Sequence, residues 1–176
     1  MKYLLAKSAG FCYGVKRAVE LAEQAAKETG NCYMLGSIIH NTHVVGRLAD
    51  LGVQTANTVE EIPPNSVVII RSHGESRDTF EALKKKGATI IDATCPNVTH
   101  IHKIVADAEK RGRQPVIIGT PDHPEVVAIA GWCDRPVVLS GEEDLEQWLH
   151  LSPAHGQMPL TFVSQTTSTR KIWDNC

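Results

Sequence analysis

The sequence predicts an α/β fold of small parallel sheets with flanking helices, and three observations lead to this prediction. Short apolar runs alternate with amphipathic stretches along the 176 residues, a pattern typical of parallel strands joined by right-handed helical crossovers. The run at residues 66–71 is apolar almost throughout, as in strands that are covered on both faces. Polar residues recur directly after the predicted strands, where open parallel sheets bind ligands.

In the first half of the chain, strands are expected at residues 2–6, 32–36, 66–71 and from residue 88. Valine and alanine residues at helical spacing predict a helix to about residue 28, with Glu23 and Lys27 as an exposed ion pair. Asn41 is the expected N-cap of a second helix, which ends at Gly52. Its expected buried residues are Val44, Val45, Leu48 and Leu51. A third helix is expected at about residues 76–86, and residues 60–65 are expected to form a loop.

The last of these strands is expected to be buried and to end at Cys95, directly before Pro96, which suits the first position of a helix. Further strands are expected at residues 115–119, 136–139 and 160–164, and further helices after His123, at 142–149 and after Thr169. The last helix runs to Cys176 without a stop signal, which predicts a cut fragment. Similar strand–helix units before and after Cys95 predict two domains, residues 1–96 and 97–176.

Composition narrows the class of protein. With 42% hydrophobic and 22% charged residues and a formal charge of -2, the chain is typical of a soluble globular protein, and nothing in its charge predicts binding to nucleic acid. It has no signal peptide and no run long enough to cross a membrane, so a cytoplasmic location is expected. Five cysteines without an export signal indicate reactive or metal-bound thiols rather than a disulfide framework.

Residues able to bind ligands or catalyse reactions follow the predicted strands in six places. They are Cys12, His40, His73, Cys95, the pair His123 and Glu125, and Thr166. Because the carboxyl ends of parallel strands meet at one edge of a sheet, these residues are candidates for a common site.

The two thiols at predicted strand-to-helix junctions, Cys12 and Cys95, are candidate metal ligands or nucleophiles, because a helix N-terminus favours a thiolate. Neither belongs to a Cys-x-x-Cys pair, so the spacings of zinc ribbons and bacterial ferredoxins are absent. Isolated thiolates from separate domains suit an iron–sulfur cluster at a domain interface. Cys32, Cys133 and Cys176 are expected to be structural.

His40, His73 and His123 could together hold a phosphate or diphosphate, because imidazoles donate hydrogen bonds near neutral pH. The other histidines are expected to be structural: His43, His100, His102, His150 and His155. Glu125 could pass protons or could simply stabilise the first turn of a helix. Thr166 could act in the site or cap the last helix.

Two other functions are compatible with these residues. The chain could be a cluster-free α/β module that presents histidines to phosphate. It could also be a thiol-dependent enzyme with Cys95 as its nucleophile.

Six motifs resemble, in order and spacing, the 4-hydroxy-3-methylbut-2-enyl diphosphate reductase family, also called LytB or IspH. They are Gly10-Phe11-Cys12-Tyr13-Gly14-Val15, Ile39-His40-Asn41, Ser72-His73-Gly74, Asp92-Ala93-Thr94-Cys95-Pro96, His123-Pro124-Glu125-Val126 and Gln165-Thr166-Thr167. The resemblance covers the whole chain.

The resemblance implies an oxidoreductase of the non-mevalonate isoprenoid pathway. It would remove an allylic hydroxyl to give isopentenyl and dimethylallyl diphosphates, with electrons from a ferredoxin or flavodoxin. It implies Cys12 and Cys95 as two of three ligands of a [4Fe-4S] cluster, and diphosphate binding by His40, His73 and His123. Glu125 is implied as the proton donor and Thr166 as the hydroxyl that positions the substrate and relays the proton.

The family fold is three similar α/β domains around a central site, a pseudo-threefold trefoil. This chain would supply two of the three arms, with the third domain absent. The family's third cysteine lies well beyond its Gln-Thr-Thr motif, whereas Cys176 follows Thr166 within a predicted helix. The resemblance therefore implies an incomplete part of the reductase that lacks the third cluster ligand.

Overall fold

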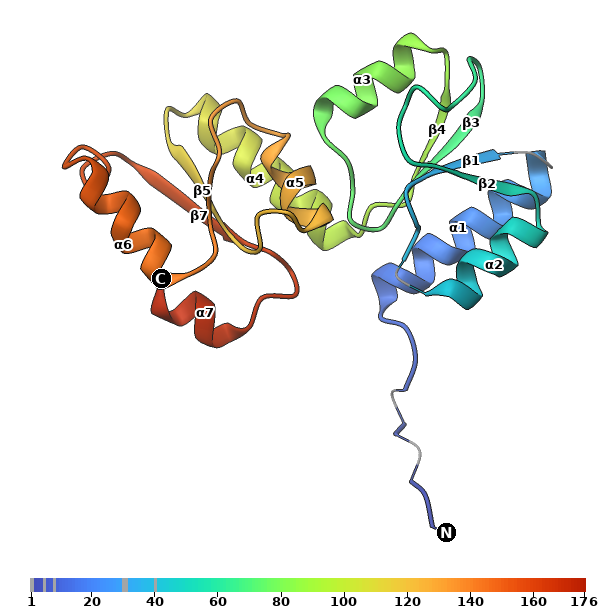
Figure 1. The fold of residues 1–176 in the computed structure, drawn as a ribbon, viewed down its shortest axis with the longest axis horizontal. Coiled ribbons are helices and arrows are strands. Elements are labelled where there is room, and N and C mark those ends of the chain that lie inside the picture. Colours follow the sequence, from blue (N-terminus) through green and yellow to red (C-terminus); the bar gives the residue numbers. More distant parts are fainter. Residues whose placement is uncertain (1, 5, 8, 30–31, 40) are drawn as a thin grey trace.

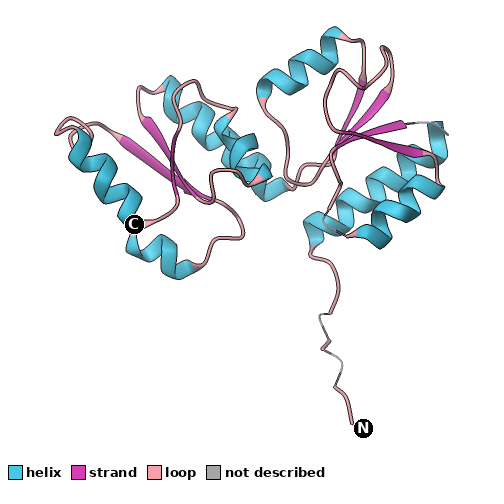
Figure 2. Cartoon of the chain, viewed as in Figure 1, coloured by secondary structure: helices cyan, strands magenta, loops and turns pink. Residues whose placement is uncertain are grey.

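The computed structural model of the protein describes residues 2–4, 6–7, 9–29, 32–39 and 41–176. Its elements form two parallel sheets with helices on both faces, so the predicted α/β fold is confirmed (Figure 2). We call each sheet with its helices a lobe. The first lobe contains α1 (Tyr13–Thr29), β1 (Cys32–Leu35), α2 (Thr42–Asp50), β2 (Val53–Ala56), β3 (Val67–Ile70), α3 (Arg77–Lys85) and β4 (Thr89–Asp92).

The second lobe begins directly after the Cys95 turn. It contains α4 (Pro96–Lys110), β5 (Gln114–Ile118), α5 (Pro124–Ala130), β6 (Val137–Leu139), α6 (Glu142–Leu151), β7 (Leu160–Ser164) and α7 (Arg170–Asn175). Among the described residues, none of the helices combines the length and the apolar character that a bilayer span requires.

The first sheet has the strand order β2-β1-β3-β4, and all its neighbouring strands are parallel. Helices α1 and α2 cover one face and α3 covers the other (Figure 1). Successive residues of β3 serve both faces: Ile69 packs in the core with α1 and α2, whereas Val68 and Ile70 pack with Leu83 of α3. The continuous apolar run of this strand therefore follows from burial on both sides.

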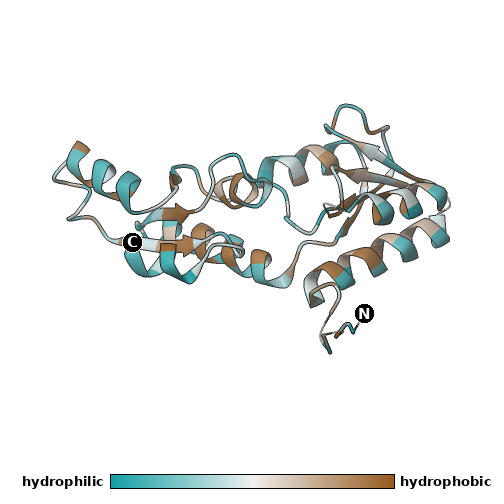
Figure 3. Cartoon of the chain, turned by 60° about the horizontal axis from the view of Figure 1, so that its bottom comes forward, coloured by the Kyte–Doolittle hydropathy of each residue, from teal (hydrophilic) through white to brown (hydrophobic). Residues whose placement is uncertain are grey.

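The second sheet has the order β6-β5-β7 and is also parallel. Ile117 of β5 packs in a core with Val105 of α4 and Ile129 of α5, while Val116 and Ile118 pack with Leu145 of α6. Hydrophobic residues accordingly lie along the strands, and they alternate with hydrophilic residues along the helices (Figure 3).

Several local predictions are confirmed. The side chain of Asn41 caps α2 by accepting a hydrogen bond from the Val44 amide at 3.1 Å. Val44 and Leu48 are buried, as expected, but Leu51 is 36% exposed because α2 ends before it. Glu23 pairs with Arg47 of α2 at 2.6 Å, and no ion pair between Glu23 and Lys27 is formed within the described residues.

Three strand predictions need correction. No strand forms in the described part of residues 2–6, where Tyr3 and Leu4 are 90% and 102% exposed, because a strand needs a hydrogen-bonded neighbour. The unpredicted strand β2 lies at an edge, where half of its residues stay exposed and no apolar run is required. Strand β4 was expected to be buried, but it is the opposite edge, and its residues are exposed or half-buried.

Candidate functional site

Six sequence-predicted residues line one cavity of roughly 270 Å³. They are Cys12, His73, Cys95, His123, Glu125 and Thr166. The first three come from the first lobe and the junction, and the others from the second lobe. All six follow strand ends or precede helices, so the parallel sheets bring them together. His40 lies outside the described residues.

Cys95 is the N-cap of α4, and the turn before it is held by an Asp–Thr pair. The Asp92 carboxylate accepts hydrogen bonds from the Thr94 amide, at 2.9 Å, and from the Thr94 hydroxyl. The Cys95 amide donates to the Ser72 carbonyl at 2.9 Å, which joins this turn to the loop after β3. The Cys95 thiol makes no capping hydrogen bond and lies on the cavity wall. The turn therefore presents the thiol to the cavity.

The first turn of α1 approaches Cys95 through a glycine. A Cβ atom added to the buried Gly14 would lie only 2.6 Å from the Cys95 sulfur, so only glycine allows this contact. Arg17, one turn later, donates to the Thr94 carbonyl at 3.1 Å. These contacts fix α1 against the Cys95 turn and bring Cys12, the residue before α1, to the same cavity.

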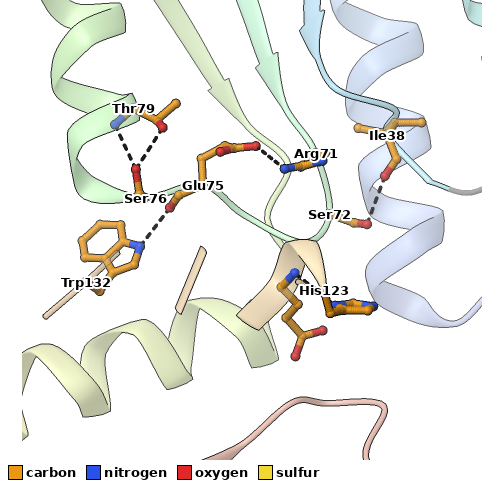
Figure 4. A network of polar contacts seen from close by, with 9 residues as sticks. Ile38, Arg71, Ser72, Glu75, Ser76, Thr79, His123 and Trp132 are labelled. Atoms are coloured by element: carbon orange, nitrogen blue, oxygen red, sulfur yellow. Dashed lines mark hydrogen bonds and ion pairs between the residues drawn. The ribbon is translucent and has the colours of Figure 1, made fainter. Parts of the chain in front are cut away.

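The loop after β3 carries His73 between two anchored positions. Ser72 is buried, and its hydroxyl donates to the Ile38 carbonyl at 3.0 Å (Figure 4). Gly74 follows with a φ of +77°, a conformation that favours glycine. His73 lies edge-on to His123 of the other lobe, with ring centroids 5.6 Å apart and planes at 89°. The two rings therefore face each other across the lobe boundary.

His123 is the N-cap of the short helix α5. Its Nδ1 accepts a hydrogen bond from the Glu125 amide at 3.1 Å, which fixes the ring over the helix end (Figure 4). Because Nδ1 acts as an acceptor, the neutral ring carries its proton on Nε2. The donor nitrogen is thus available to a ligand in the cavity.

Glu125 is only 2% exposed, and its carboxylate receives two hydrogen bonds from Thr166. The Thr166 amide donates to Oε1 at 2.5 Å and the Thr166 hydroxyl donates to Oε2 at 2.7 Å. A buried carboxylate requires such partners. The two residues follow the neighbouring strands β5 and β7, so sheet pairing sets their contact. Together they form a hydrogen-bonded carboxylate–hydroxyl pair at the cavity.

Sequence reasoning missed the residues that support these six. Gln165 is buried, and its side chain accepts from the Thr120 amide at 3.2 Å and donates to the Thr167 hydroxyl at 2.6 Å, which braces the loop after β5. Gly14, Ser72, Asp92 and Thr94 act similarly around Cys95. Their signal in the sequence was their place in the motifs beside the cysteines and histidines.

Most residues expected to be structural lie away from the cavity. Cys32 and Cys133 are buried; burial raises the pKa of both thiols, that of Cys133 to about 11. His43, His100 and His150 are exposed, and His155 stacks on Trp148 at 4.4 Å. His102 is only 4% exposed, whereas His100 on the same helix is exposed.

Metal binding depends on the donor atoms of the described residues. They contain no group of three His, Cys, Asp or Glu side chains placed to hold a metal ion. They do offer two free thiols, Cys12 and Cys95, on one cavity wall. Thiolates suit iron–sulfur clusters, so this donor set fits two ligands of such a group and lacks a third.

Comparisons with known proteins cover nearly the whole chain. The sequence model of the LytB protein family matches residues 3–176. Curated relatives named 4-hydroxy-3-methylbut-2-enyl diphosphate reductase include one from Caldanaerobacter subterraneus subsp. tengcongensis, 39% identical over 180 residues, and one from Aquifex aeolicus, 41% identical over 175. The matches cover 99% and 97% of this chain but 60% and 58% of the relatives. The chain thus spans about 60% of the length of these relatives.

Solved structures give the same result. One, described as (E)-4-hydroxy-3-methyl-but-2-enyl diphosphate reductase, the terminal enzyme of the non-mevalonate pathway, is 39% identical with a TM-score of 0.82 and covers 97% of this chain. The Plasmodium falciparum E-1-hydroxy-2-methyl-but-2-enyl-4-diphosphate reductase is 28% identical with a TM-score of 0.88, and the match covers 96% of this chain. The alignments span 60% and 52% of those chains.

Proposed function

The chain belongs to the LytB protein family, and from this premise we propose that the protein is a 4-hydroxy-3-methylbut-2-enyl diphosphate reductase. It would remove the allylic hydroxyl to give isopentenyl and dimethylallyl diphosphates in the last step of the non-mevalonate isoprenoid pathway. The observation that carries this proposal is the convergence of two thiols, two histidines, a carboxyl and a hydroxyl on one cavity.

The residues proposed to hold a [4Fe-4S] cluster are Cys12 and Cys95. The proposal is supported by their free thiols at the cavity and by Gly14, which leaves room for the Cys95 sulfur. The third cysteine would belong to the part of the relatives' length that this chain does not span. When bound, the cluster would supply electrons and an open iron that acts as a Lewis acid.

The diphosphate would be held by His73 and His123, with His40 as the proposed third donor. The facing rings of His73 and His123 support this role. The Nδ1 of His123 is occupied by the Glu125 amide, so its Nε2 would donate to a phosphate oxygen. The two histidines would thus fix the end of the substrate that does not react.

Glu125 would supply protons through Thr166. The reduction takes two electrons and two protons: one proton leaves with the hydroxyl as water, and the other is added to the allyl group. The Thr166 hydroxyl lies 2.7 Å from the Glu125 carboxylate and donates to it. In the relay, a protonated Glu125 would donate to this hydroxyl oxygen, and the hydroxyl would pass its own proton into the cavity. Glu125 is buried and Thr166 is exposed, so the hydroxyl would connect the buried carboxyl to the cavity.

The electrons would arrive singly from a ferredoxin or flavodoxin, and a cytoplasmic location would suit both donors. The proposal is tested by anaerobic purification of the full-length protein. We expect a brown, iron-containing sample that oxidises a reduced dye only when substrate is present. Cys12→Ser and Cys95→Ser should lose iron, whereas the control Cys133→Ser should retain it. A colourless, iron-free protein would refute the proposal.

The contact between the facing histidines involves no thiol, and it favours a second function, the binding of diphosphate in the absence of a cluster. The 176-residue chain would then bind diphosphate without a cluster. Calorimetry of the metal-free chain with inorganic diphosphate tests this: binding that is lost in His73→Ala and His123→Ala supports it, and an absence of binding excludes it. Rapid alkylation of Cys95, compared with Cys133, would instead indicate a thiol-dependent enzyme.

A further inference from the structure

The two lobes touch at a second place, beyond the cavity, where the loop after β3 meets the end of α5. The Trp132 indole Nε1 donates to the Glu75 carbonyl at 2.9 Å (Figure 4). In return, Arg77 donates from its side chain to the Trp132 carbonyl at 2.5 Å and from its amide to the Gly131 carbonyl at 3.2 Å. We call these contacts of Glu75, Arg77, Gly131 and Trp132 the lobe clamp.

The backbones at the lobe clamp are in close contact. A Cβ atom added to Gly131 would lie 2.3 Å from the Ser76 Cβ, so only glycine lets the end of α5 approach this loop. The Glu75 carboxylate is tied to its own lobe by an ion pair with Arg71 at 2.8 Å. The lobe clamp therefore joins two locally fixed segments and leaves little freedom between them.

His102 of α4 packs against the Trp132 indole. Its ring stacks on Trp132, with centroids 5.1 Å apart and planes at 17°. A Cβ atom on Gly74 would lie 2.7 Å from the His102 Cε1, so the His73–Gly74 turn rests directly on this ring. Within the described residues, the His102 Nε2 has no hydrogen-bond partner. Burial lowers the pKa of His102 to about 4, which keeps the ring neutral near pH 7.

The same two segments, the loop after β3 and helix α5, carry both the lobe clamp and the facing histidines. His73 lies two residues before Glu75 on the loop, and His123 is the N-cap of the helix α5, whose C-cap is Gly131. Helix α5 has only 7 residues and is a short rigid connection. A shift at Trp132 would therefore be transmitted to the separation of the two imidazole rings.

We infer that Trp132, Arg77 and His102 are positioning residues, which set the spacing and angle of His73 and His123 across the lobe boundary. None of the three lines the cavity. The role of that spacing in holding a diphosphate rests on the proposed function, whereas the effect of the lobe clamp on the two rings does not.

The test compares two tryptophans with similar surroundings. Trp132→Phe keeps an aromatic ring on this side chain but removes the Nε1 donor and part of the ring volume, and Trp148→Phe removes the same volume. Trp148→Phe is the matched control, because Trp148 also stacks on a histidine, His155, but within the second lobe. Arg77→Gln breaks the lobe clamp from the other side without changing an aromatic ring near the histidines.

Two measurements on the whole chain separate the inference from the proposed function. The first is the imidazole ¹⁵N–¹H spectrum of His73 and His123. We expect their signals to shift in Trp132→Phe and Arg77→Gln but not in Trp148→Phe. The second is calorimetry with inorganic diphosphate, where the dissociation constant should rise about tenfold, the effect expected when one hydrogen bond no longer fixes the geometry.

Melting temperatures identify any variant that merely loses stability. Unchanged His73 and His123 signals in both clamp variants would overturn the inference, whatever the binding result. Shifted signals in a chain that never binds diphosphate would uphold the lobe clamp and count against the proposed diphosphate site. Equal shifts in Trp148→Phe would also overturn the inference, because the effect would then not depend on the lobe boundary.

Discussion

Two turns of the molecule have almost the same backbone but use their side chains differently. Cys95 and His123 are both N-caps directly before a proline, with φ and ψ of -57° and 132° in one and -69° and 132° in the other. The His123 side chain caps its own helix, whereas the Cys95 thiol makes no cap bond and lies against Gly14 instead. Proline at N1 defines the helix start in both. Both side chains line the cavity, but only that of His123 also caps its helix.

The largest difference between the two turns should appear in activity. In the full-length protein, Glu125→Gln removes the proposed proton donor beside the His123 turn, and we expect the reduction rate to fall about 10³-fold with iron content retained. Cys95→Ser should lose iron as well as activity. The measurement is dye oxidation together with iron analysis. Equal iron loss in both variants would show that the turns do not have separate roles.

The helices that follow the two turns should also differ in their response to pH. His102 of α4 has its pKa lowered by burial from 6.5 to about 4, and Asp92 opposes this only partly. The folded protein therefore binds fewer protons than the unfolded chain between these values. The contribution of the buried, neutral His102 to the free energy of unfolding is complete above pH 6.5. It falls by about 3 kcal/mol as the pH decreases to about 4.

Chemical denaturation from pH 7 to pH 4 measures this effect. The slope of the free energy of unfolding against pH should become flatter in His102→Leu, because leucine cannot take up a proton. His100→Leu, an exposed neighbour on the same helix, is the control and should keep the slope. An unchanged slope in His102→Leu would mean that other groups cause the acid sensitivity.

The contact of Cys95 with α1 gives the third prediction. Gly14→Ala places a Cβ atom 2.6 Å from the sulfur, so we expect the free energy of unfolding to fall by about 2 kcal/mol, as in overpacked cores. Gly46→Ala is the matched control: Gly46 is also in a helix, but a Cβ there meets no atom of the described residues within 4 Å. That variant should gain about 0.5–1 kcal/mol. Similar values for both would disprove the close contact at Cys95.

The smallest effect should come from the caps themselves. His123→Ala removes the acceptor of the Glu125 amide and should cost about 1 kcal/mol in the metal-free chain. Cys95→Ala loses no cap bond, so its cost should be smaller. Urea denaturation of both variants measures the difference, and a reversed order would contradict the assignment of the caps.

The parts of the fold that the sequence predicted well are those that local chemistry determines. The N-cap at Asn41, the proline start of α4 and the doubly covered run of β3 each depend on a few neighbouring residues. Strand β2 was missed and a strand at residues 2–6 was wrongly expected, because a strand depends on its neighbours in the sheet rather than on its own composition. The predicted ion pair between Glu23 and Lys27 was wrong because α2 places Arg47 next to Glu23 instead.

The site could be predicted as a set of residues but not as an arrangement. Predicted strand ends identified the six residues that line the cavity, although the strand expected before Cys12 does not form in the described residues. Gly14, Gln165 and the lobe clamp required knowledge of which loops meet. Nothing near Trp132 in the sequence indicates that its indole bonds to Glu75, 57 residues away. His102 was expected to be a structural residue, and the lack of a hydrogen-bond partner for its Nε2 within the described residues could be seen only in three dimensions.

The contacts that close the cavity also have a consequence for the order of folding. Arg17 reaches Thr94 across 77 positions of the chain, farther than any strand pairing in the first sheet. Contacts between distant segments form late, because the entropy of closing long loops is lost before the contact is gained. We therefore expect the first sheet to form before the Arg17 contact fixes α1 against the Cys95 turn. A nascent chain would pass through a stage in which its thiols are already present but not yet enclosed.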